Sequence, residues 1–342
     1  MSARESIIPV FVPHLGCPND CVFCNQRRIS GQTRPATAQT VREAIENAAA
    51  LPQTGAKRQL AFYGGSFTAI PVKEQTSLLE AAKAHLDRGD IASVRLSTRP
   101  DAIDGEVLAR LKKYGVETIE LGAQSMDEEV LRLSGRGHTA EDVENASRQI
   151  QAAGFQLILQ MMTGLPGDSE EKSLETAGRI ISLRPDGVRI YPTVIVRDTA
   201  LFDLWKAGRY QEHSVEDAVR VCAKILPLFE KAGIPVIRLG LNPTEDLSAG
   251  EAAGGAYHPA LGELVKSRIL YEKARALLRD TEPGSVVVLG VTPGRVSQMV
   301  GQHRANVTAL CGEFGLAGLK VRPAEIKNDE IVILSVEKER GV

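Results

Sequence analysis

Short apolar segments alternate with amphipathic segments of helical length between Ile7 and Val196. The apolar segments have the length of strands, whereas the segments between them place apolar residues at helical spacing. This repeated strand–helix order predicts a parallel sheet whose strands are joined by right-handed crossovers. The predicted strands, with the turns that follow some of them, lie at residues 7–12, 59–67, 93–101, 118–125, 155–168 and 188–196.

Polar or glycine-rich stretches follow most of these strands: a cysteine-rich loop, "YGGS", "STRPD", "GAQS" and "TGLPGD". In a (β/α) barrel the loops that follow the strands gather at one face, where the chemistry takes place. We therefore predict an α/β fold, a partial (β/α)6 TIM-like barrel with its polar groups at one mouth. Six units instead of eight leave such a barrel open on one side, with room for a large substrate.

The pattern changes after the sixth unit. A mostly helical passage and a further strand candidate, "IPVIRLGL", lead into a loop rich in small residues and then into another helix. From "TEPGSVVVLGV" onward, a β-α-β pattern indicates a small separate α/β lobe. The predicted division is a barrel at residues 1–235, an extension at 236–283 and the lobe at 284–342.

The predicted lobe contains "VSQMVGQHRANVTALCGEFGLAGLKV", which has the rhythm of a KH-type RNA-binding unit. Its "GQHR" (Gly301 to Arg304) stands where a G-x-x-G turn would clamp a nucleic acid backbone. Because the second glycine is missing, this KH-like unit is degenerate. A lobe without any RNA contact is the alternative interpretation.

The charge balance gives no strong field, since 41 basic and 43 acidic residues leave a net charge of 41 − 43 = −2. A net charge this small gives no overall attraction to nucleic acid or anionic lipid. A local basic stripe would nevertheless suffice for RNA binding. Arg268, Arg275 and Arg279 share one face of the last predicted helix. With Glu272 interleaved, this face is equally typical of a solvated surface.

The sequence also indicates a compartment. We find no apolar run long enough for a membrane span or a signal peptide. Five cysteines, an odd number with three clustered, do not resemble a secreted disulfide framework. The expected location is a reducing cytoplasm, with no membrane partner. Cys222 and Cys311 lie among core-type positions and are expected to be buried, inert thiols.

Cys17, Cys21 and Cys24 fall within eight residues of one another in "GCPNDCVFC". A zinc site could recruit His14 as a fourth ligand, although structural zinc usually takes two ligand pairs from separate segments. A redox pair lacks the thioredoxin-like setting. Three thiols on a loop after the first barrel strand suit a 4Fe–4S cluster that keeps one iron open for chemistry.

The spacing C-x3-C-x2-C, with Phe23 before the last cysteine, resembles the signature of the radical S-adenosylmethionine (SAM) superfamily. That superfamily places a glycine-rich turn after its second strand, where it receives the amino group of SAM. The segment "YGGSF", with Gly64, Gly65 and Ser66, stands at that place, and glycine lets the backbone approach a ligand closely. An ordinary tight turn is the alternative.

Further motifs resemble the radical SAM domain of the Elongator catalytic-subunit family over roughly residues 6 to 280: "STRPD", "ELGAQS", "GRGHT", "MTGLPGD" and "RIYPTVIVRDTALFDLWKAGRYQEHSVEDAV". "YHPALGELVKSRILYEKA" is similar to the carboxy-terminal extension of that domain, which assigns residues 236–283. Oxygen-independent coproporphyrinogen oxidases share "LGAQS" and "GLPG" more loosely. We find no coenzyme A turn of the acetyltransferase domain that the family carries, so its two-part reaction is not transferred whole.

The resemblance implies roles for individual residues. Polar groups of Glu120 and Gln124 would lie near SAM, and Leu165 would cover its adenine. Arg99, and Arg136 together with His138, would pair with the SAM carboxylate or with substrate, since arginine presents a bidentate fork. Ordinary turns and salt bridges on the barrel rim are the alternatives. By resemblance, the substrate-side candidates are Tyr191, Arg197, Tyr257 and His258, each of which has a purely structural alternative.

The resemblance therefore implies a radical SAM enzyme with a 4Fe–4S cluster held by Cys17, Cys21 and Cys24, and with SAM as cosubstrate. It implies an electron donor of the flavodoxin or ferredoxin type and a tRNA base as the substrate. One alternative is a radical SAM lyase, decarboxylase or oxidase for a small molecule such as a modified nucleobase or a porphyrinogen. Another is a non-enzymatic iron–sulfur or zinc RNA-binding protein.

Overall fold

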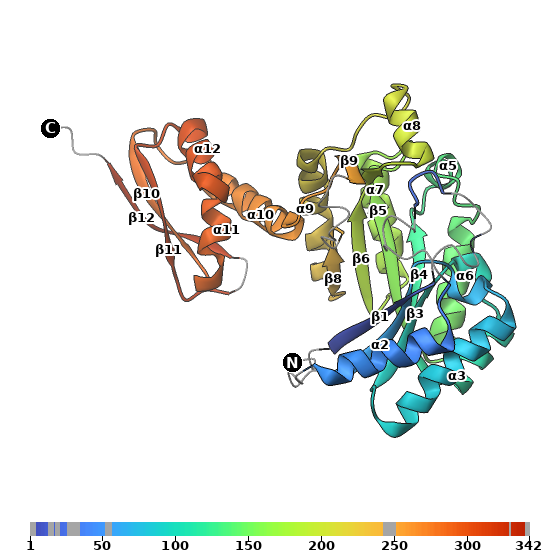
Figure 1. The fold of residues 1–342 in the computed structure, drawn as a ribbon. Coiled ribbons are helices and arrows are strands. Elements are labelled where there is room, and N and C mark those ends of the chain that lie inside the picture. The colour runs from blue at the N-terminus through green and yellow to red at the C-terminus, as the bar shows by residue number, and fades with distance from the viewer. Residues whose placement is uncertain are drawn as a thin grey trace. The chain divides into compact units, whose positions relative to one another are not determined.

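The fold is seen in a computed structural model, which describes residues 5–12, 17, 21–25, 35–51, 57–241, 251–327 and 330–338 (Figure 1). The chain divides into two compact units. The first comprises residues 1–214 and 225–257, and the second comprises residues 215–224 and 258–342.

The first unit is built on a seven-stranded sheet in the order β1-β2-β3-β4-β5-β6-β8, in which every neighbouring pair is parallel. Spatial order follows chain order, and the sheet curls as a partial barrel does (Figure 1). The predicted partial TIM-like barrel is confirmed, and "IPVIRLGL" supplies a seventh strand at its edge. The strands are β1 (Glu5–Phe11), β2 (Lys57–Tyr63), β3 (Ser93–Thr98), β4 (Val116–Gln124), β5 (Gln156–Thr163), β6 (Gly187–Pro192) and β8 (Val236–Leu239).

Helices cover one face of this sheet (Figure 1). Most of them are amphipathic and start at a side-chain N-cap, which satisfies backbone N–H groups that have no partner within the helix. In α4, for example, the Asp104 carboxylate accepts a hydrogen bond from the backbone N–H of Val107 at 2.8 Å. The helices of the barrel are α2 (Ala38–Ala50), α3 (Val72–Arg88), α4 (Gly105–Lys113), α5 (Glu128–Leu133), α6 (Ala140–Ala152), α7 (Glu170–Ser182) and α8 (Ala200–Lys206).

Side chains alternate across the sheet, and the two faces differ in chemistry. On β4, Ile119 and Leu121 are fully buried, and this strand packs against α4 and α6. Thr118 and Glu120 alternate with them and therefore point to the other, concave face. Because a strand has a period of two, the apolar set holds the helices while the polar set is left for the barrel interior.

A short ribbon follows the barrel strands. It pairs β7 (Val194–Val196) with β9 (Ala252–Gly255) in antiparallel orientation. Helix α9 (Val215–Lys231) connects this region to β8 and contributes residues to both compact units. Cys222 on α9 is fully buried, as its neighbours in the sequence predict.

The second unit contains a three-stranded sheet in the order β11-β10-β12, with β10 parallel to β11 and antiparallel to β12. Its helices bury a separate apolar cluster against that sheet. The unit therefore includes α10 in addition to the predicted lobe, and the predicted boundaries at 236 and 284 stay predictions. Its elements are α10 (Leu261–Leu277), β10 (Ser285–Val291), α11 (Val296–Val300), α12 (Ala305–Phe314), β11 (Gly318–Pro323) and β12 (Ile331–Lys338).

The "GQHR" turn joins α11 to α12, where a KH-like unit would have its G-x-x-G turn. Gly301, His303 and Arg304 all have positive φ angles, of 78°, 49° and 63°. The Asn306 side-chain amide donates to Ser267 Oγ on α10 at 3.0 Å, which ties the turn to that helix. RNA contact by this turn stays a prediction.

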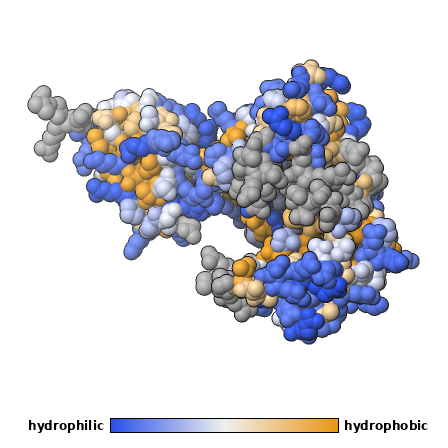
Figure 2. Space-filling model, in the orientation of Figure 1, coloured by the Kyte–Doolittle hydropathy of each residue, from blue (hydrophilic) through white to orange (hydrophobic). Residues whose placement is uncertain are grey.

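The surface of the second unit is mixed. Arg268 pairs with Glu272, and Arg275 pairs with Glu313, so these two arginines have the partners expected of a solvated helix face. Figure 2 shows apolar surface over β10 to β12, to which β12 contributes exposed Leu334 and other side chains. Among the described residues of both units, no helix is long and apolar enough to cross a membrane.

We expect Leu121→Ala to lower the free energy of unfolding by about 2–5 kcal/mol, because it empties a fully buried position between β4 and its helices. Leu51→Ala is the matched control, since Leu51 is 66% exposed and its truncation leaves no cavity. Urea denaturation of both variants measures the difference. Equal unfolding midpoints would contradict the packing described here.

Candidate active site

The cysteine loop follows β1 at the carboxyl ends of the barrel strands, where a chain of backbone hydrogen bonds holds it. The N–H of Val22 donates to the carbonyl of Ser134 at 3.1 Å. On the other side, the N–H of Leu201 donates to the carbonyl of Val22 at 2.7 Å. The loop is thus fixed between the end of α5 and the start of α8, two segments far apart in the sequence.

Phe23 lies under this loop and packs with Val22 against an apolar cluster formed by Ile195, Leu201 and Tyr210. Phe202 and Trp205 of α8 pack against the same cluster. The aromatic residue before the last cysteine therefore anchors the loop to the chain that follows β6. A small or polar residue at this position would leave the loop without its apolar support.

The three clustered thiols are exposed or half-buried, and none of them forms a disulfide. Within the described ranges, no three His, Cys, Asp or Glu side chains form a preassembled metal site. The donor chemistry nevertheless fits an iron–sulfur cluster, since three thiol ligands sit on one loop and a guanidinium lies beside them to offset thiolate charge. His14, the possible fourth ligand of a zinc site, lies outside the described residues.

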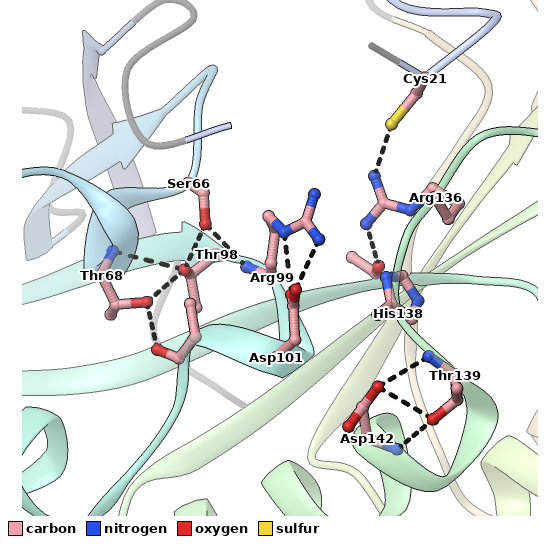
Figure 3. A network of polar contacts seen from close by, with 12 residues as sticks. Cys21, Ser66, Thr68, Thr98, Arg99, Asp101, Arg136, His138, Thr139 and Asp142 are labelled. Atoms are coloured by element: carbon pink, nitrogen blue, oxygen red, sulfur yellow. Dashed lines mark hydrogen bonds and ion pairs between the residues drawn. The ribbon is translucent and has the colours of Figure 1, made fainter. Parts of the chain in front are cut away.

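Arg136 connects the cysteine loop to the sheet (Figure 3). Its Nη1 donates to Cys21 Sγ at 3.3 Å, and its Nη2 donates to the carbonyl of Gly122 at 2.7 Å. A Cβ at Gly122 would lie 2.8 Å from Gln124 Nε2 and 3.3 Å from Arg136 Nη2, so glycine leaves space for both side chains. Gln124 itself has a φ of 66°, an uncommon value for a residue other than glycine.

His138 lies near this arginine and is 4% exposed (Figure 3). Its Nε2 is 3.1 Å from the carbonyl oxygen of Ala123. Burial, and then the positive charge of Arg136, lower the pKa of His138 to about 4. The imidazole is therefore neutral near pH 7, and Nε2 carries the proton that the carbonyl accepts.

The segment after β2 forms a second part of the site. Ser66 is fully buried, its Oγ lies 2.9 Å from Thr98 Oγ1, and it accepts a hydrogen bond from the backbone N–H of Arg99 at 3.2 Å. Gly64 has a φ of 95°, which glycine adopts without strain. The "YGGS" turn is thereby fastened to the end of β3.

Arg99 already has a partner in the protein. Its Nε and Nη2 donate to the two carboxylate oxygens of Asp101 at 2.8 and 2.6 Å (Figure 3). Burial of the Cys17 sulfur, although the residue as a whole is exposed, and then the charge of Cys21 raise the pKa of the Cys17 thiol. Arg99 and then Arg136 act in the opposite direction, which places both guanidinium groups within electrostatic reach of the cysteine loop.

The "GLPGD" turn after β5 is held from several directions. The Asp168 carboxylate accepts hydrogen bonds from the N–H of Gly164 at 2.7 Å and from the hydroxyl of Ser173 at 2.7 Å. A Cβ at Gly164 would lie 2.1 Å from the His213 ring, so only glycine fits there. Leu165 is 2% exposed within this turn.

Glu120 lies in the middle of β4 rather than at its end, with no solvent exposure. It is surrounded by polar side chains from four neighbouring strands on the concave face, none of which belongs to the candidate site residues predicted from the sequence: Tyr63 on β2, Arg95 on β3, Gln160 on β5 and Arg189 on β6. A signal was available, since charged residues alternate with apolar ones in "SVRLST", "TIELGA" and "VRIYP". Period-two alternation identifies a face, but it does not say that these faces meet.

The four substrate-side candidates lie in different places. Tyr191, at the end of β6, has its hydroxyl 3.4 Å from Arg189 Nη1 on the concave face. Arg197 is exposed after β7, with its guanidinium 5.9 Å from the ring of Phe202. Tyr257 packs against Val194 and Val196 of β7.

His258 is the first residue of the longer segment of the second compact unit, and its Nδ1 accepts a hydrogen bond from the N–H of Ala260 at 3.1 Å. The structure thus gives Tyr191 a position on the barrel interior and Arg197 and Tyr257 positions at the β7–β9 ribbon. It gives His258 a local contact within its own unit.

Comparison with known proteins shows which family models and which relatives match this chain. The radical SAM superfamily model matches residues 11–180, and the model of the radical SAM C-terminal domain matches residues 185–270. Elongator complex protein 3 of Homo sapiens is 29% identical over 248 residues, which are 67% of this chain and 44% of the human protein. The tRNA uridine(34) acetyltransferase of Methanocaldococcus infernus is 29% identical over 201 residues, which are 58% of this chain and 37% of that protein.

Among solved structures, the archaeal Methanocaldococcus infernus Elp3 matches with a TM-score of 0.63 and 23% identity, over 83% of this chain and 67% of that chain. This likeness shows a shared fold. The chain spans less than half the length of the two curated relatives. The similarity to them lies in the radical SAM region.

We expect the stability of the protein to fall as the pH drops from about 6.5 to about 4, because His138 stays neutral in the fold while its unfolded counterpart takes up a proton. The loss attributable to this residue is on the order of 3 kcal/mol. Urea unfolding of wild type and His138→Gln across this range measures it. If both lose stability equally over this interval, the depressed pKa is wrong.

Proposed function

Because the chain belongs to the radical SAM superfamily and is an enzyme of that class, we propose that it cleaves SAM reductively and acts on a base of tRNA. The observation that carries the proposal is the contact between Arg136 and Cys21, at 3.3 Å, on a loop with two further thiols at the carboxyl ends of barrel strands. That is the face at which barrel enzymes do their chemistry.

In this proposal Cys17, Cys21 and Cys24 hold a 4Fe–4S cluster as thiolates. When bound, such a cluster supplies the one electron that splits SAM into methionine and a deoxyadenosyl radical, which takes a hydrogen atom from a substrate. The protein's part is to position the three sulfurs. The backbone bonds of Val22 and the apolar contacts of Phe23 fix the loop, and the Arg136 guanidinium offsets its negative charge.

We propose that SAM lies between the "YGGS" turn and the "GLPGD" turn. The backbone of Gly64 and Gly65, with Ser66, receives its amino group, and Leu165 covers the adenine. Arg136, Gln124 and Arg99 surround its carboxylate, and Arg99 arrives there already oriented by Asp101. Glu120, although buried deeper in β4, borders the same space, because it accepts a hydrogen bond from Tyr63, the residue before Gly64.

A tRNA base as the substrate is supported by two observations. One curated relative carries tRNA uridine(34) in its name, and the similarity to it falls on the radical SAM region. The concave face also offers polar side chains where a packed barrel core would be apolar. Tyr191 on that face, with Arg197, Tyr257 and His258, is proposed to contact the RNA.

The reaction further needs a source of single electrons. We propose a small electron-transfer protein of the flavodoxin or ferredoxin type and a reducing cytoplasmic setting, where the clustered thiols stay available as ligands.

We expect the anaerobically reconstituted protein to release 5′-deoxyadenosine from SAM, and Cys21→Ala to reduce this release to background because one cluster ligand is lost. Cys311→Ala is the matched control, since this thiol is partly buried among apolar residues of the second unit and belongs to none of the motifs that form the site. Chromatographic quantification of 5′-deoxyadenosine and measurement of iron and sulfide content check both variants.

The same assay with and without tRNA tests the substrate. Added tRNA should raise 5′-deoxyadenosine release, and its binding should weaken steeply as salt rises, because bound phosphates release counterions. No SAM cleavage by protein that carries a full complement of iron and sulfide would overturn the radical SAM reaction. Stimulation by small nucleobase-like or porphyrinogen molecules and not by tRNA would overturn the choice of substrate.

A further inference from the structure

Five neighbouring strands send polar side chains to one point on the concave face of the barrel. Glu120 is at the centre, and its carboxylate has no exposure to solvent. The interiors of (β/α) barrels are normally packed with branched apolar side chains. A buried ion pair is also no general source of stability, because removing two charges from water costs several kcal/mol per ion. We call this surface the polar floor. Its residues are Tyr63, Arg95, Glu120, Gln160, Arg189 and Tyr191, and this arrangement calls for a functional explanation.

The contacts of Glu120 fix the side chains around it. Oε1 accepts hydrogen bonds from Arg95 Nη1 at 2.9 Å, Arg189 Nη2 at 3.1 Å and the hydroxyl of Tyr63 at 3.2 Å. Oε2 accepts one from Gln160 Nε2 at 2.9 Å and lies 2.9 Å from Arg189 Nε. Two nitrogens of Arg189, Nε and Nη2, thus contact the Glu120 carboxylate, and this geometry sets the plane of the guanidinium.

Two donors on this floor remain directed away from Glu120. Arg189 Nη1 donates to the hydroxyl oxygen of Tyr191 at 3.4 Å. That contact occupies an acceptor site of the phenol and leaves its O–H to donate elsewhere. Among the described residues, no acceptor within hydrogen-bonding distance of this O–H is present. Arg189 Nη1 carries a second hydrogen beside it, and the Arg189 side chain is 13% exposed.

The protonation states of the two tyrosines agree with a donating O–H on Tyr191. Burial, and then the charge of Glu120, raise the pKa of Tyr63 well above its usual range. Burial also raises the pKa of Tyr191, although Arg189 opposes it. Both phenols are therefore protonated at any ordinary pH, so Tyr191 presents an O–H donor and not a phenolate.

We infer that Arg189 and Tyr191 read the edge of the substrate base, and that Glu120 is the positioning residue that aligns them; this inference rests on the proposed function. Each of these donors matches a carbonyl oxygen of a base, which uracil, cytosine and guanine carry and adenine lacks. Adenine places an amino donor beside its N7 acceptor, so its edge opposes one of the two donors. The floor therefore selects uracil, cytosine or guanine over adenine.

The Arg189 guanidinium lies over the ring of Tyr63, 5.7 Å from its centre, so the ring helps Glu120 to hold the guanidinium in place. Base selection therefore rests on the donors of Arg189 and Tyr191.

The test compares fluorescein-labelled oligouridylate, oligocytidylate and oligoadenylate of equal length by fluorescence anisotropy with the full chain. We expect wild type to bind the uridine and cytidine oligomers about fivefold or more tightly than the adenosine oligomer, since one matched donor pair discriminates by about 1–3 kcal/mol. Tyr191→Phe should bring the three dissociation constants close together. Tyr114→Phe, at a tyrosine outside the floor whose hydroxyl contacts Glu80, should keep the wild-type ratio.

Equal affinities in wild type, or an unchanged ratio in Tyr191→Phe, would overturn the inference. The wild-type comparison stands by itself if the variant does not fold, which its thermal unfolding curve reports. Release of 5′-deoxyadenosine, measured on the same preparations, tests the proposed function separately. Selective RNA binding without SAM cleavage would reject the proposed SAM cleavage reaction. SAM cleavage without base selectivity would reject only the inference that Arg189 and Tyr191 select the base.

Discussion

A single side chain, Arg136, connects the loop that carries the cysteines to the barrel that would hold the cosubstrate. Its guanidinium donates to the sulfur of Cys21 and to the carbonyl of Gly122 on β4, so one rigid group connects the loop to the strand. Gly122 is what permits this, because a Cβ there would lie against the arginine. Cys21 and Gly122 both contact this guanidinium, and its charge lowers the pKa of His138.

The barrel separates structure from chemistry by strand alternation. On β3, β4 and β6, apolar residues on one face pack toward the helices, whereas Arg95, Glu120 and Arg189 on the other face meet in the interior. The side chains in the interior therefore do not have to form the hydrophobic core between the strands and the helices. Glu120 can hold two arginines there without weakening the packing of the helices. Stability and specificity are thus assigned to opposite faces of the same strands.

The sequence predicts the barrel well, because both strand length and loop chemistry are local properties. It also predicts the cysteine loop, since three thiols at close spacing are chemically unusual. It does not predict that Arg99 is paired with Asp101, nor that Glu120 lies at mid-strand between Arg95 and Arg189. The contacts of Glu120 join residues from different strands, so they depend on how the sheet curls rather than on any local pattern. Arg99 and Asp101 are only two residues apart, and their pairing depends on the geometry of the turn after β3.

The most direct measurement of the central claim is the electron paramagnetic resonance spectrum of the reduced, reconstituted protein before and after SAM is added. The account predicts the signal of a reduced 4Fe–4S cluster that changes its g values when SAM binds, because three cysteines leave one iron open to the cosubstrate. A spectrum unaffected by SAM, or a protein that assembles no such cluster, would contradict it.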